Sequence, residues 1–219
     1  MRRLLPDPGR EREMVTVAPG AVWLRGWLSI EAQQALVTRC AAIMDGPAGG
    51  YVPVVRGGGR MHVRMTSLGR HWNPLTYTYM PTRADHDHAP VAPVPADWVA
   101  LASRVAAEAG FACTPDICLV NFYDSSGRMG LHQDKDEGPA SIAAGLPVVS
   151  ISLGDTARFL FGGLRRRDPV QTIPLESGDV FVFGGPARLR YHGVTRTMPG
   201  TAPASLPIDG RFNLTFRTY

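Results

Sequence analysis

The chain has 219 residues, of which 44% are hydrophobic and 19% are charged, so one domain with a sizeable core is expected. The formal net charge of +4 fits a polyanionic partner but is also common among ordinary enzymes, so charge alone selects no function. Three cysteines without CxxC spacing argue against a disulfide framework and a zinc ribbon, and no apolar run approaches the roughly 20 residues that span a bilayer. We therefore expect a cytoplasmic protein with no membrane association.

The N-terminal part is expected to begin with disorder and to continue into a pair of strands. Residues 1–14 are charged and interrupted by proline, and we expect them to be disordered, while residues 15–219 are expected to form a single domain. Residues 14–28 read as two strands joined by a turn at Pro19 and Gly20.

Two helices are predicted next. Ser29 is an expected N-cap, because apolar residues recur after it at helical spacing until the stop at residues 45–47. The second helix is predicted from Ala96 to Ala109 and ends at Gly110, a residue type that favours helix ends.

Residues 46–96 differ in composition from the rest of the chain. Glycine and proline clusters alternate there with arginine and aromatic residues, which is typical of a mobile segment that covers a surface. Residues 85–88, with the sequence DHDH, are of metal-ligand types, but they lie among prolines with no rigid element beside them to preorganise a site. We expect them to form a solvated loop.

The C-terminal half is a series of short β-type runs separated by turn residues. These runs are ICLVNFY, VVSISL, ARFLFG, DVFVFGG and RFNLTFR, and they extend from Ile117 to the end of the chain. Many short strands at this spacing predict a β-sandwich or a β-barrel.

A metal centre is predicted from three residues of this half. His132 and Asp134 are two residues apart, and in a strand such residues point to the same face. His192 follows after enough strands for the sheet to fold back over the first pair. Two imidazoles and one carboxylate on one side of a metal are the donor set of non-haem Fe(II) oxygenases. The His-x-Asp pattern alone is weak evidence, because a histidine in a strand more often has no metal to bind.

The last run, RFNLTFR, strengthens the prediction. Strict alternation places Arg211, Asn213, Thr215 and Arg217 on one face and the apolar residues on the other. Burying two guanidinium groups is costly unless anions meet them. The polar face is therefore either exposed to solvent or bound to a dicarboxylate, with one arginine for each carboxylate.

These motifs together resemble the bacterial AlkB DNA-repair dioxygenases. The resemblance covers roughly residues 18–219 and is carried by NFY (121–123), LHQDKDE (131–137), VSISLG (149–154), FGGLRRRDP (161–169), YHG (191–193) and RFNLTFR (211–217). It implies an α+β, mainly β fold: a double-stranded β-helix (jelly-roll) core at about 117–219, with N-terminal helices and a nucleotide-recognition lid at about 46–96.

The same resemblance implies a role for each candidate residue. Fe(II) would be held by His132, Asp134 and His192. The cosubstrate 2-oxoglutarate would be bound by Asn121, Tyr123, Arg211, Asn213 and Arg217, with Arg211 and Tyr123 at the distal carboxylate and with Arg217 and Asn121 nearer the keto-acid end. The target base would be contacted by Trp72, Tyr77, Asp136 and Arg166.

The implied reaction is the oxidative demethylation of N-alkylated DNA bases such as 1-methyladenine and 3-methylcytosine. It uses Fe(II), 2-oxoglutarate and O2 and releases formaldehyde, succinate and CO2. The expected partner is alkylated DNA, or RNA, as a single strand or as a duplex with a flipped base, and the protein is expected to be a monomer. Two alternatives remain open: a related oxygenase that acts on RNA or protein, and a nucleic-acid-binding module without catalysis.

Overall fold

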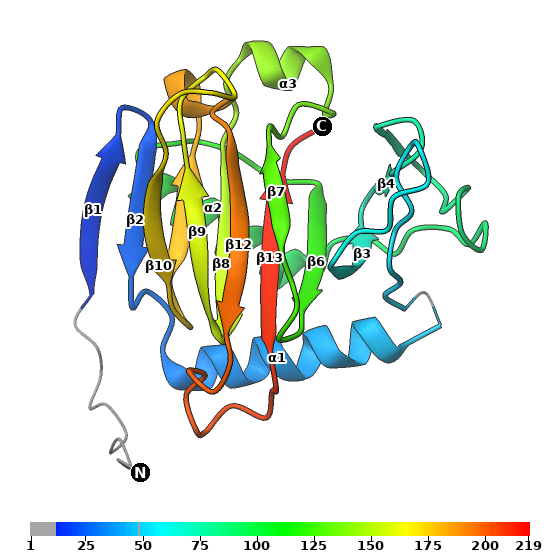
Figure 1. Cartoon of the computed structure of the whole chain (residues 1–219), viewed down its shortest axis with the longest axis horizontal. Coiled ribbons are helices and arrows are strands. Elements are labelled where there is room, and N and C mark those ends of the chain that lie inside the picture. The colour runs from blue at the N-terminus through cyan, green and yellow to red at the C-terminus, as the bar shows by residue number, and fades with distance from the viewer. Residues whose placement is uncertain (1–11, 48) are drawn as a thin grey trace.

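The computed structural model of the chain describes residues 12–47 and 49–219, and it contains two large β-sheets that lie against each other and a separate two-stranded sheet (Figure 1). This is the mainly β, double-stranded β-helix arrangement that the family resemblance implied. The predicted disorder of residues 1–14 falls largely on residues 1–11, which lie outside the described residues. The first strand begins at Glu13, so residues 13 and 14 belong to the larger sheet.

Seven strands form the larger sheet, in the order β1-β2-β11-β8-β13-β6-β3. Their bounds in that order are Glu13–Ala18, Ala21–Arg25, Val180–Phe183, Val148–Gly154, Arg211–Arg217, Ile117–Tyr123 and Arg64–Leu68. All neighbours pair antiparallel. The strands predicted in these regions are confirmed. The core also includes β1, β2 and β3, which come before the predicted start of the core at residue 117.

Four strands form the smaller sheet, in the order β10-β9-β12-β7. Their bounds in that order are Gln171–Leu175, Thr156–Phe161, His192–Met198 and Met129–His132. Only β9 matches a run that the sequence analysis named. β10 contains Pro174, which cannot donate a ladder hydrogen bond, and β12 changes register between Val194 and Arg196, so the local sequence signal of both strands is weak.

Two helices cover the outer face of the larger sheet. Helix α1 (Ile30–Asp45) begins where predicted, because the Ser29 hydroxyl oxygen accepts a hydrogen bond from the Ala32 amide at 3.3 Å. Helix α2 (Ala96–Glu108) packs beside it, and their apolar stripes share one buried cluster with the sheet (Figure 1). Two short helices, α3 (Pro139–Ala143) and η1 (Gly185–Ala187), lie in loops. Within the described ranges, no helix has both the length and the apolar character needed to cross a membrane.

A second buried cluster fills the space between the two sheets. Phe159 and Phe161 of β9 meet Phe181 and Phe183 of β11, with neighbouring ring centroids 5.0 to 6.1 Å apart. The ring of Phe183 also lies 4.9 Å from that of His192. This aromatic core therefore supports one of the predicted metal ligands from behind.

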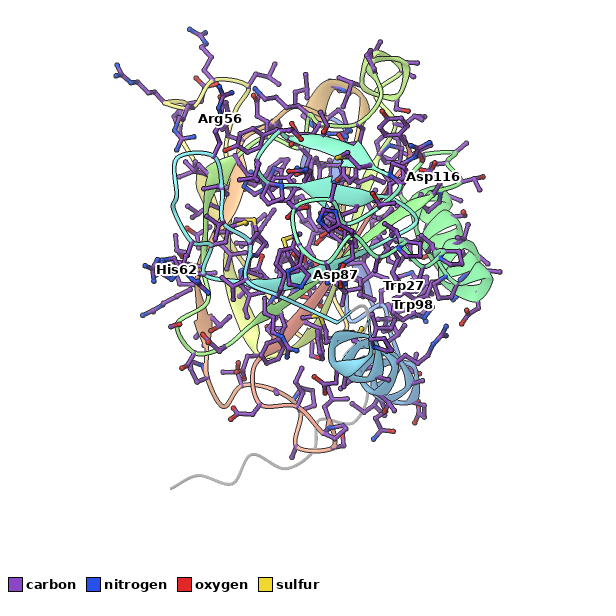
Figure 2. The ribbon with its side chains drawn as sticks, turned by 90° about the vertical axis from the view of Figure 1, so that its right-hand side faces the viewer. Trp27, Arg56, His62, Asp87, Trp98 and Asp116 are labelled. Atoms are coloured by element: carbon purple, nitrogen blue, oxygen red, sulfur yellow. The ribbon has the colours of Figure 1, made fainter. Side chains whose placement is uncertain are left out.

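The segment 46–96 is only partly a surface covering. Its strand β3 pairs with β6 and so belongs to the larger sheet, while β4 (His71–Asn73) and β5 (Thr78–Met80) form a separate hairpin. A hydrogen bond of 3.2 Å from the Arg56 amide to the Pro74 carbonyl ties the loop around residue 56 to this hairpin. Figure 2 looks onto this side of the molecule, with Asp87 near its centre and with Arg56 and His62 toward one edge.

The expectation of a solvated loop at residues 85–88 is wrong for Asp85. Its side chain is 3% exposed and lies 2.5 Å from Nε2 of His71, and it accepts a hydrogen bond of 2.9 Å from the Tyr51 hydroxyl. Residues 86–88 are exposed, as expected. A buried polar cluster therefore anchors this loop to β4, which carries Trp72.

Candidate metal centre

The two histidines of the predicted metal centre face each other across neighbouring strands. His132 is the last residue of β7, His192 is the first residue of β12, and the two are directly opposed, with ring centroids 4.4 Å apart. Nδ1 of His132 lies 2.9 Å from the carbonyl oxygen of Gly130, and Nδ1 of His192 lies 3.0 Å from that of Arg190. Since a carbonyl oxygen can only accept, each Nδ1 carries a proton, and a neutral ring then has the Nε2 lone pair available for a metal.

Asp134 completes the group from a loop. Strand β7 ends at His132, so the expectation that one strand presents both residues of the His-x-Asp motif is wrong for Asp134. Its carboxylate nevertheless reaches both rings, with Oδ1 at 3.5 Å from Nε2 of His132 and Oδ2 at 3.6 Å from Nε2 of His192. The strand pairing therefore positions two members of the group, and other contacts must position the third.

The Arg217 guanidinium binds the same carboxylate, with Nη2 at 2.6 Å from Oδ2 of Asp134. Burial opposes the ionisation of Asp134, but the charge of Arg217 is among the effects that outweigh it and hold the pKa of this carboxyl well below its usual range. Burial, together with the neighbouring His132, lowers the pKa of His192. Near neutral pH the group thus presents a carboxylate and a neutral imidazole at His192, the forms that bind metal ions.

The donor set fits Fe(II). One ligand atom from each of His132, Asp134 and His192 lies within 4.8 Å of the others, and no other such group of His, Cys, Asp or Glu occurs in the described residues. Two imidazoles with free Nε2 atoms and one carboxylate form the facial set of non-haem iron oxygenases.

The group opens into a cavity of about 520 Å³, within the size range of ligand-binding pockets. Strands of both sheets line it. Every residue that the sequence analysis assigned to the metal, to 2-oxoglutarate or to the target base is among its lining residues: Trp72, Tyr77, Asn121, Tyr123, His132, Asp134, Asp136, Arg166, His192, Arg211, Asn213 and Arg217.

Arg211 brings a buried positive charge into this cavity. Its side chain is among the largest that are fully buried, so the alternative of a solvent-exposed polar face on β13 is wrong. Its guanidinium donates to the carbonyl oxygens of Asp155 and Leu175 at 3.2 Å and to the Ser152 hydroxyl at 2.7 Å, all of which are neutral acceptors. Burial lowers the pKa of Arg211 to about 10. A carboxylate of a bound ligand would supply the missing negative partner.

Arg217, at the other end of β13, differs because it already contacts carboxylates. Besides Asp134, its Nε lies 3.1 Å from Oε1 of Glu137, and its Nη1 donates to the Tyr79 hydroxyl at 2.5 Å. The two arginines thus lie on one face of one strand, but only Arg217 is joined to the metal group. Arg211 and Arg217 are the first and last residues of β13, and both line the cavity.

Two asparagines and a tyrosine lie on β6 and β13 beside the arginines. Asn121 and Asn213 are directly opposed on β6 and β13, and the Asn121 side-chain oxygen is buried without a hydrogen-bond partner. Tyr123 is opposed to Arg211, and burial raises the pKa of its phenol to about 12, so it keeps its proton and can donate. These polar groups fit the carboxylate and keto oxygens of a dicarboxylic keto acid.

Three of the four predicted base-binding residues are joined through Trp72, while Arg166 has contacts elsewhere on the cavity. The Trp72 indole donates a hydrogen bond of 2.8 Å to Asp136, and its ring lies 6.0 Å from that of Tyr77. Tyr77 is 41% exposed and has a positive φ of 57°, a strained conformation for a large side chain. Arg166 donates to the carbonyl oxygen of Leu131, beside His132, at 2.7 Å.

Sequence reasoning missed three buried residues of this region. Tyr79 and Glu137 line the cavity, and Arg188 contacts Glu137 at 2.8 Å. For Tyr79 the sequence offers a signal, because alternation in TYTYM (76–80) places it on the same face as Tyr77. Glu137 also has one, because it lies inside the LHQDKDE motif. Arg188 carries no local signal, because its role depends on a loop far away in the sequence.

Comparisons with known proteins agree with this geometry. The family model for the 2OG-Fe(II) oxygenase superfamily matches residues 20–217. The chain is 41% identical over 207 residues to the alpha-ketoglutarate-dependent dioxygenase AlkB homolog of Caulobacter vibrioides, which covers 93% of this chain and 89% of that relative. It is also 41% identical over 224 residues to the DNA N(6)-methyladenine demethylase ALKBH1C of Arabidopsis thaliana, covering 93% of this chain and 49% of that relative.

The solved structure of OsALKBH1 is similar throughout, with a TM-score of 0.88 and 39% identity, over 94% of this chain and all of that one. The chain spans about half the length of the plant demethylase sequences that it matches. The chain therefore belongs to the 2OG-Fe(II) oxygenase superfamily and, within it, to the AlkB family of alpha-ketoglutarate-dependent dioxygenases.

Proposed function

We propose that this protein is an Fe(II)- and 2-oxoglutarate-dependent dioxygenase that removes methyl groups from N-alkylated bases in DNA. The observation that carries the proposal is a single cavity that holds the His-Asp-His group, the buried Arg211 and the Trp72 indole. The names of two relatives support it, one an alpha-ketoglutarate-dependent dioxygenase and the other a DNA N(6)-methyladenine demethylase.

In this proposal, Fe(II) would be held by Nε2 of His132, a carboxylate oxygen of Asp134 and Nε2 of His192. The hydrogen bonds from each Nδ1 to a backbone carbonyl fix the ring orientations, as in many metal sites.

The cosubstrate would be held by residues of β13 and β6, with Arg211 and Tyr123 binding its distal carboxylate. Arg217 and Asn121 would bind nearer the keto-acid end, and Asn213 would lie between the two ends. The charge pattern supports this direction, because Arg217 contacts the metal ligand Asp134 whereas Arg211 has only neutral acceptors. Arg217 would therefore bind the cosubstrate at the end nearest the metal ligand Asp134.

The β4–β5 hairpin of the segment 46–96 acts as the lid that receives the target base. An enzyme that acts on a base must take it out of the stack and hold it between flat or apolar groups. The Trp72 ring supplies such a face, and the hydrogen bond to Asp136 sets its angle. Tyr77 closes the outer side of the cavity, and Arg166 is placed to meet the base or its phosphate.

Bound Fe(II) and 2-oxoglutarate supply the oxidation of an N-methyl group by O2, with formaldehyde, succinate and CO2 as products beside the repaired base. The residues of this chain bind and orient 2-oxoglutarate and the methylated base and exclude water from the space between them. Burial of the cavity walls strengthens the contacts of Arg211 and Arg217 with carboxylates.

The proposal also covers the form of the DNA substrate, the oligomeric state of the protein and its compartment. The substrate is a single strand or a duplex with a flipped base, because the cavity is lined by strands of both sheets and an enzyme that acts on a base must take it out of the stack. The protein acts as a monomer. Its cysteines, Cys40, Cys113 and Cys118, are free, which supports a reducing compartment such as the cytoplasm.

The test is a mass measurement on modified oligonucleotides. The purified protein is incubated with Fe(II), 2-oxoglutarate and DNA that contains 1-methyladenine, 3-methylcytosine or N6-methyladenine, as a single strand and as a duplex. We expect at least one oligonucleotide to lose the mass of one CH2 with release of formaldehyde, and Asp134→Ala to abolish the loss. No mass change on any of the DNA substrates would contradict the proposal.

The same assay separates the other candidate functions. Methylated RNA and methylated peptides are run in parallel, and a faster reaction on one of them identifies an RNA or protein oxygenase instead. DNA binding without succinate formation on any substrate identifies a binding module.

A further inference from the structure

Asp134 needs an anchor other than the sheet, because it lies beyond the end of β7. The loop after His132, residues 133–138, faces the loop that leads to His192, residues 185–191. Gln133 donates through its side chain to the Leu189 carbonyl oxygen at 2.6 Å. The loop that carries Asp134 and the loop that leads to His192 therefore contact each other directly.

Arg188 is the centre of these contacts. Its Nη1 donates to the main-chain carbonyl oxygen of Asp134, and its Nη2 lies 2.8 Å from Oε2 of Glu137. The other oxygen of Glu137 lies 3.1 Å from Nε of Arg217, which in turn binds the Asp134 carboxylate. Asp134 is thus held at its main chain by Arg188 and at its side chain by Arg217, and Glu137 joins the two arginines.

Arg188 is 3% exposed and is not among the residues that line the cavity. It therefore has no route to the substrate or the cosubstrate. A buried ion pair is also weak evidence for stability, since apolar residues often replace such a pair without loss. The contacts of Arg188 indicate that it holds the loop of Asp134 in place.

We propose that Arg188 is a positioning residue that sets the place of the Asp134 carboxylate relative to His132 and His192. The proposal rests on the metal centre of the proposed function. Contacts outside the ligand shell commonly tune metal affinity in this way, and their loss costs roughly 10- to 100-fold. The guanidinium suits the task because its planar fork reaches a carbonyl and a carboxylate at once, which the single ammonium of lysine cannot do.

The test compares Arg188→Met with Arg190→Met. Arg190 is a matched control because it lies in the same loop and its guanidinium binds the backbone carbonyl of Gly162 without contacting Asp134. Its main-chain carbonyl, which meets Nδ1 of His192, is kept in Arg190→Met because only the side chain changes. Glu137 keeps Arg217 as a partner in Arg188→Met, so no buried charge is left alone. The readouts are the affinity for Co(II), followed through its absorption bands, and the midpoint of thermal unfolding measured without metal.

We expect Arg188→Met to weaken Co(II) binding by roughly 10- to 100-fold and Arg190→Met to change it by less than about threefold. Similar unfolding midpoints in the two variants would show that the loss of Co(II) affinity comes from the position of the Asp134 carboxylate and not from a loss of stability. Wild-type Co(II) affinity in folded Arg188→Met would overturn the proposal.

A second variant covers the case in which Arg188→Met does not fold. Arg188→Lys keeps the charge beside Glu137 but can make only one of the two contacts, so we expect it to fold and to bind Co(II) more weakly than wild type. Wild-type affinity in Arg188→Lys would then overturn the proposal. Asp134→Ala distinguishes failure of the metal centre from failure of the role of Arg188. If Asp134→Ala binds Co(II) as wild type does, the assignment of the metal centre is wrong. If only the Arg188 variants bind Co(II) as wild type does, the metal centre stands and the role of Arg188 is wrong.

Discussion

His132 and His192 form a cross-strand pair, so the distance between their rings is fixed by the hydrogen-bonded register of β7 and β12. A shift of one residue in that register would turn one of the two side chains to the opposite face of the sheet. The spacing of two proposed iron ligands is therefore a property of the sheet, while the third ligand depends on loop contacts with Arg188 and Arg217.

The first prediction concerns the third ligand. Asp134→Ala removes the only carboxylate of the group, and we expect Co(II) affinity to fall by more than about 100-fold, beyond the loss that outer contacts cause. Asp124→Ala is the control, since Asp124 lies in an exposed turn where it binds Ser126. Equal Co(II) affinity in both variants, measured by titration calorimetry, would contradict the assignment.

The second prediction separates the two arginines of β13. Loss of a charge-assisted hydrogen bond costs about 1.5–3 kcal/mol, which corresponds to roughly 10- to 100-fold in affinity. We expect Arg211→Met to weaken 2-oxoglutarate binding by this factor and to leave Co(II) affinity unchanged. Arg217→Met should weaken both, because Arg217 also holds Asp134.

Calorimetric titrations with each ligand distinguish these outcomes. Arg196→Met serves as the control, since Arg196 is exposed on β12. If Arg211→Met bound 2-oxoglutarate as wild type does, the distal carboxylate would have to lie elsewhere.

The third prediction concerns Trp72. Stacking of a base on an aromatic side chain contributes about 1–3 kcal/mol, so Trp72→Ala should raise the KM for a methylated oligonucleotide by roughly tenfold or more. The rate of 2-oxoglutarate decarboxylation in the absence of nucleic acid should stay within about twofold of wild type, because Trp72 is not among the residues proposed to bind the cosubstrate. A parallel loss of both activities, measured as succinate release, would show a general role of Trp72 in folding the site.

The fourth prediction concerns a glycine at the end of β3. Gly69 has φ of +79°, and a Cβ there would lie 1.8 Å from the Asp116 carbonyl oxygen. Gly58 has a similar φ of +86° but no atom within 4 Å of such a Cβ. Gly58→Ala should lower the free energy of unfolding by about 1–2 kcal/mol, the cost of the left-handed backbone, and Gly69→Ala should lower it by clearly more. Urea denaturation of the two variants gives the comparison, and equal losses would refute the close approach.

The fifth prediction is a pH dependence that originates at His71. Burial lowers the pKa of His71 from its ordinary 6.5, and its Nδ1 is buried without an acceptor, so a second proton has no partner there. The unfolded chain therefore binds this proton at a higher pH than the folded chain does. Stability from His71 is fully present above about pH 6.5 and is lost as the pH falls below that value toward the lower folded pKa.

Thermal unfolding between pH 7.5 and 5.5 tests this sign. The pKa of His192 is also lowered, so His192 lowers stability at acidic pH in wild type and variant alike. The comparison is therefore between the slopes of the unfolding midpoint against pH. We expect the unfolding midpoint of His71→Gln to fall less steeply with decreasing pH than that of wild type. Identical slopes would mean that His71 does not titrate differently in the folded state.

Local sequence patterns determined much of the fold. Ser29 capped α1 as predicted, because capping depends on one hydroxyl and the next turn of helix. The alternation in RFNLTFR placed Arg211 and Arg217 on the cavity face, because side chains alternate along any strand. The motif residues that the family resemblance assigned all line one cavity.

Tertiary structure decided what lies between these local elements. Asp134 was expected on a strand but lies in a loop, and its position depends on Arg188 and Arg217, which are 54 and 83 residues away in the sequence. Asp85 was expected in solvent but is buried against Tyr51 and His71, since a loop's exposure depends on what packs over it. Periodicity reports which face a side chain takes, whereas contacts between distant loops arise only when the sheets close, and no local pattern encodes them.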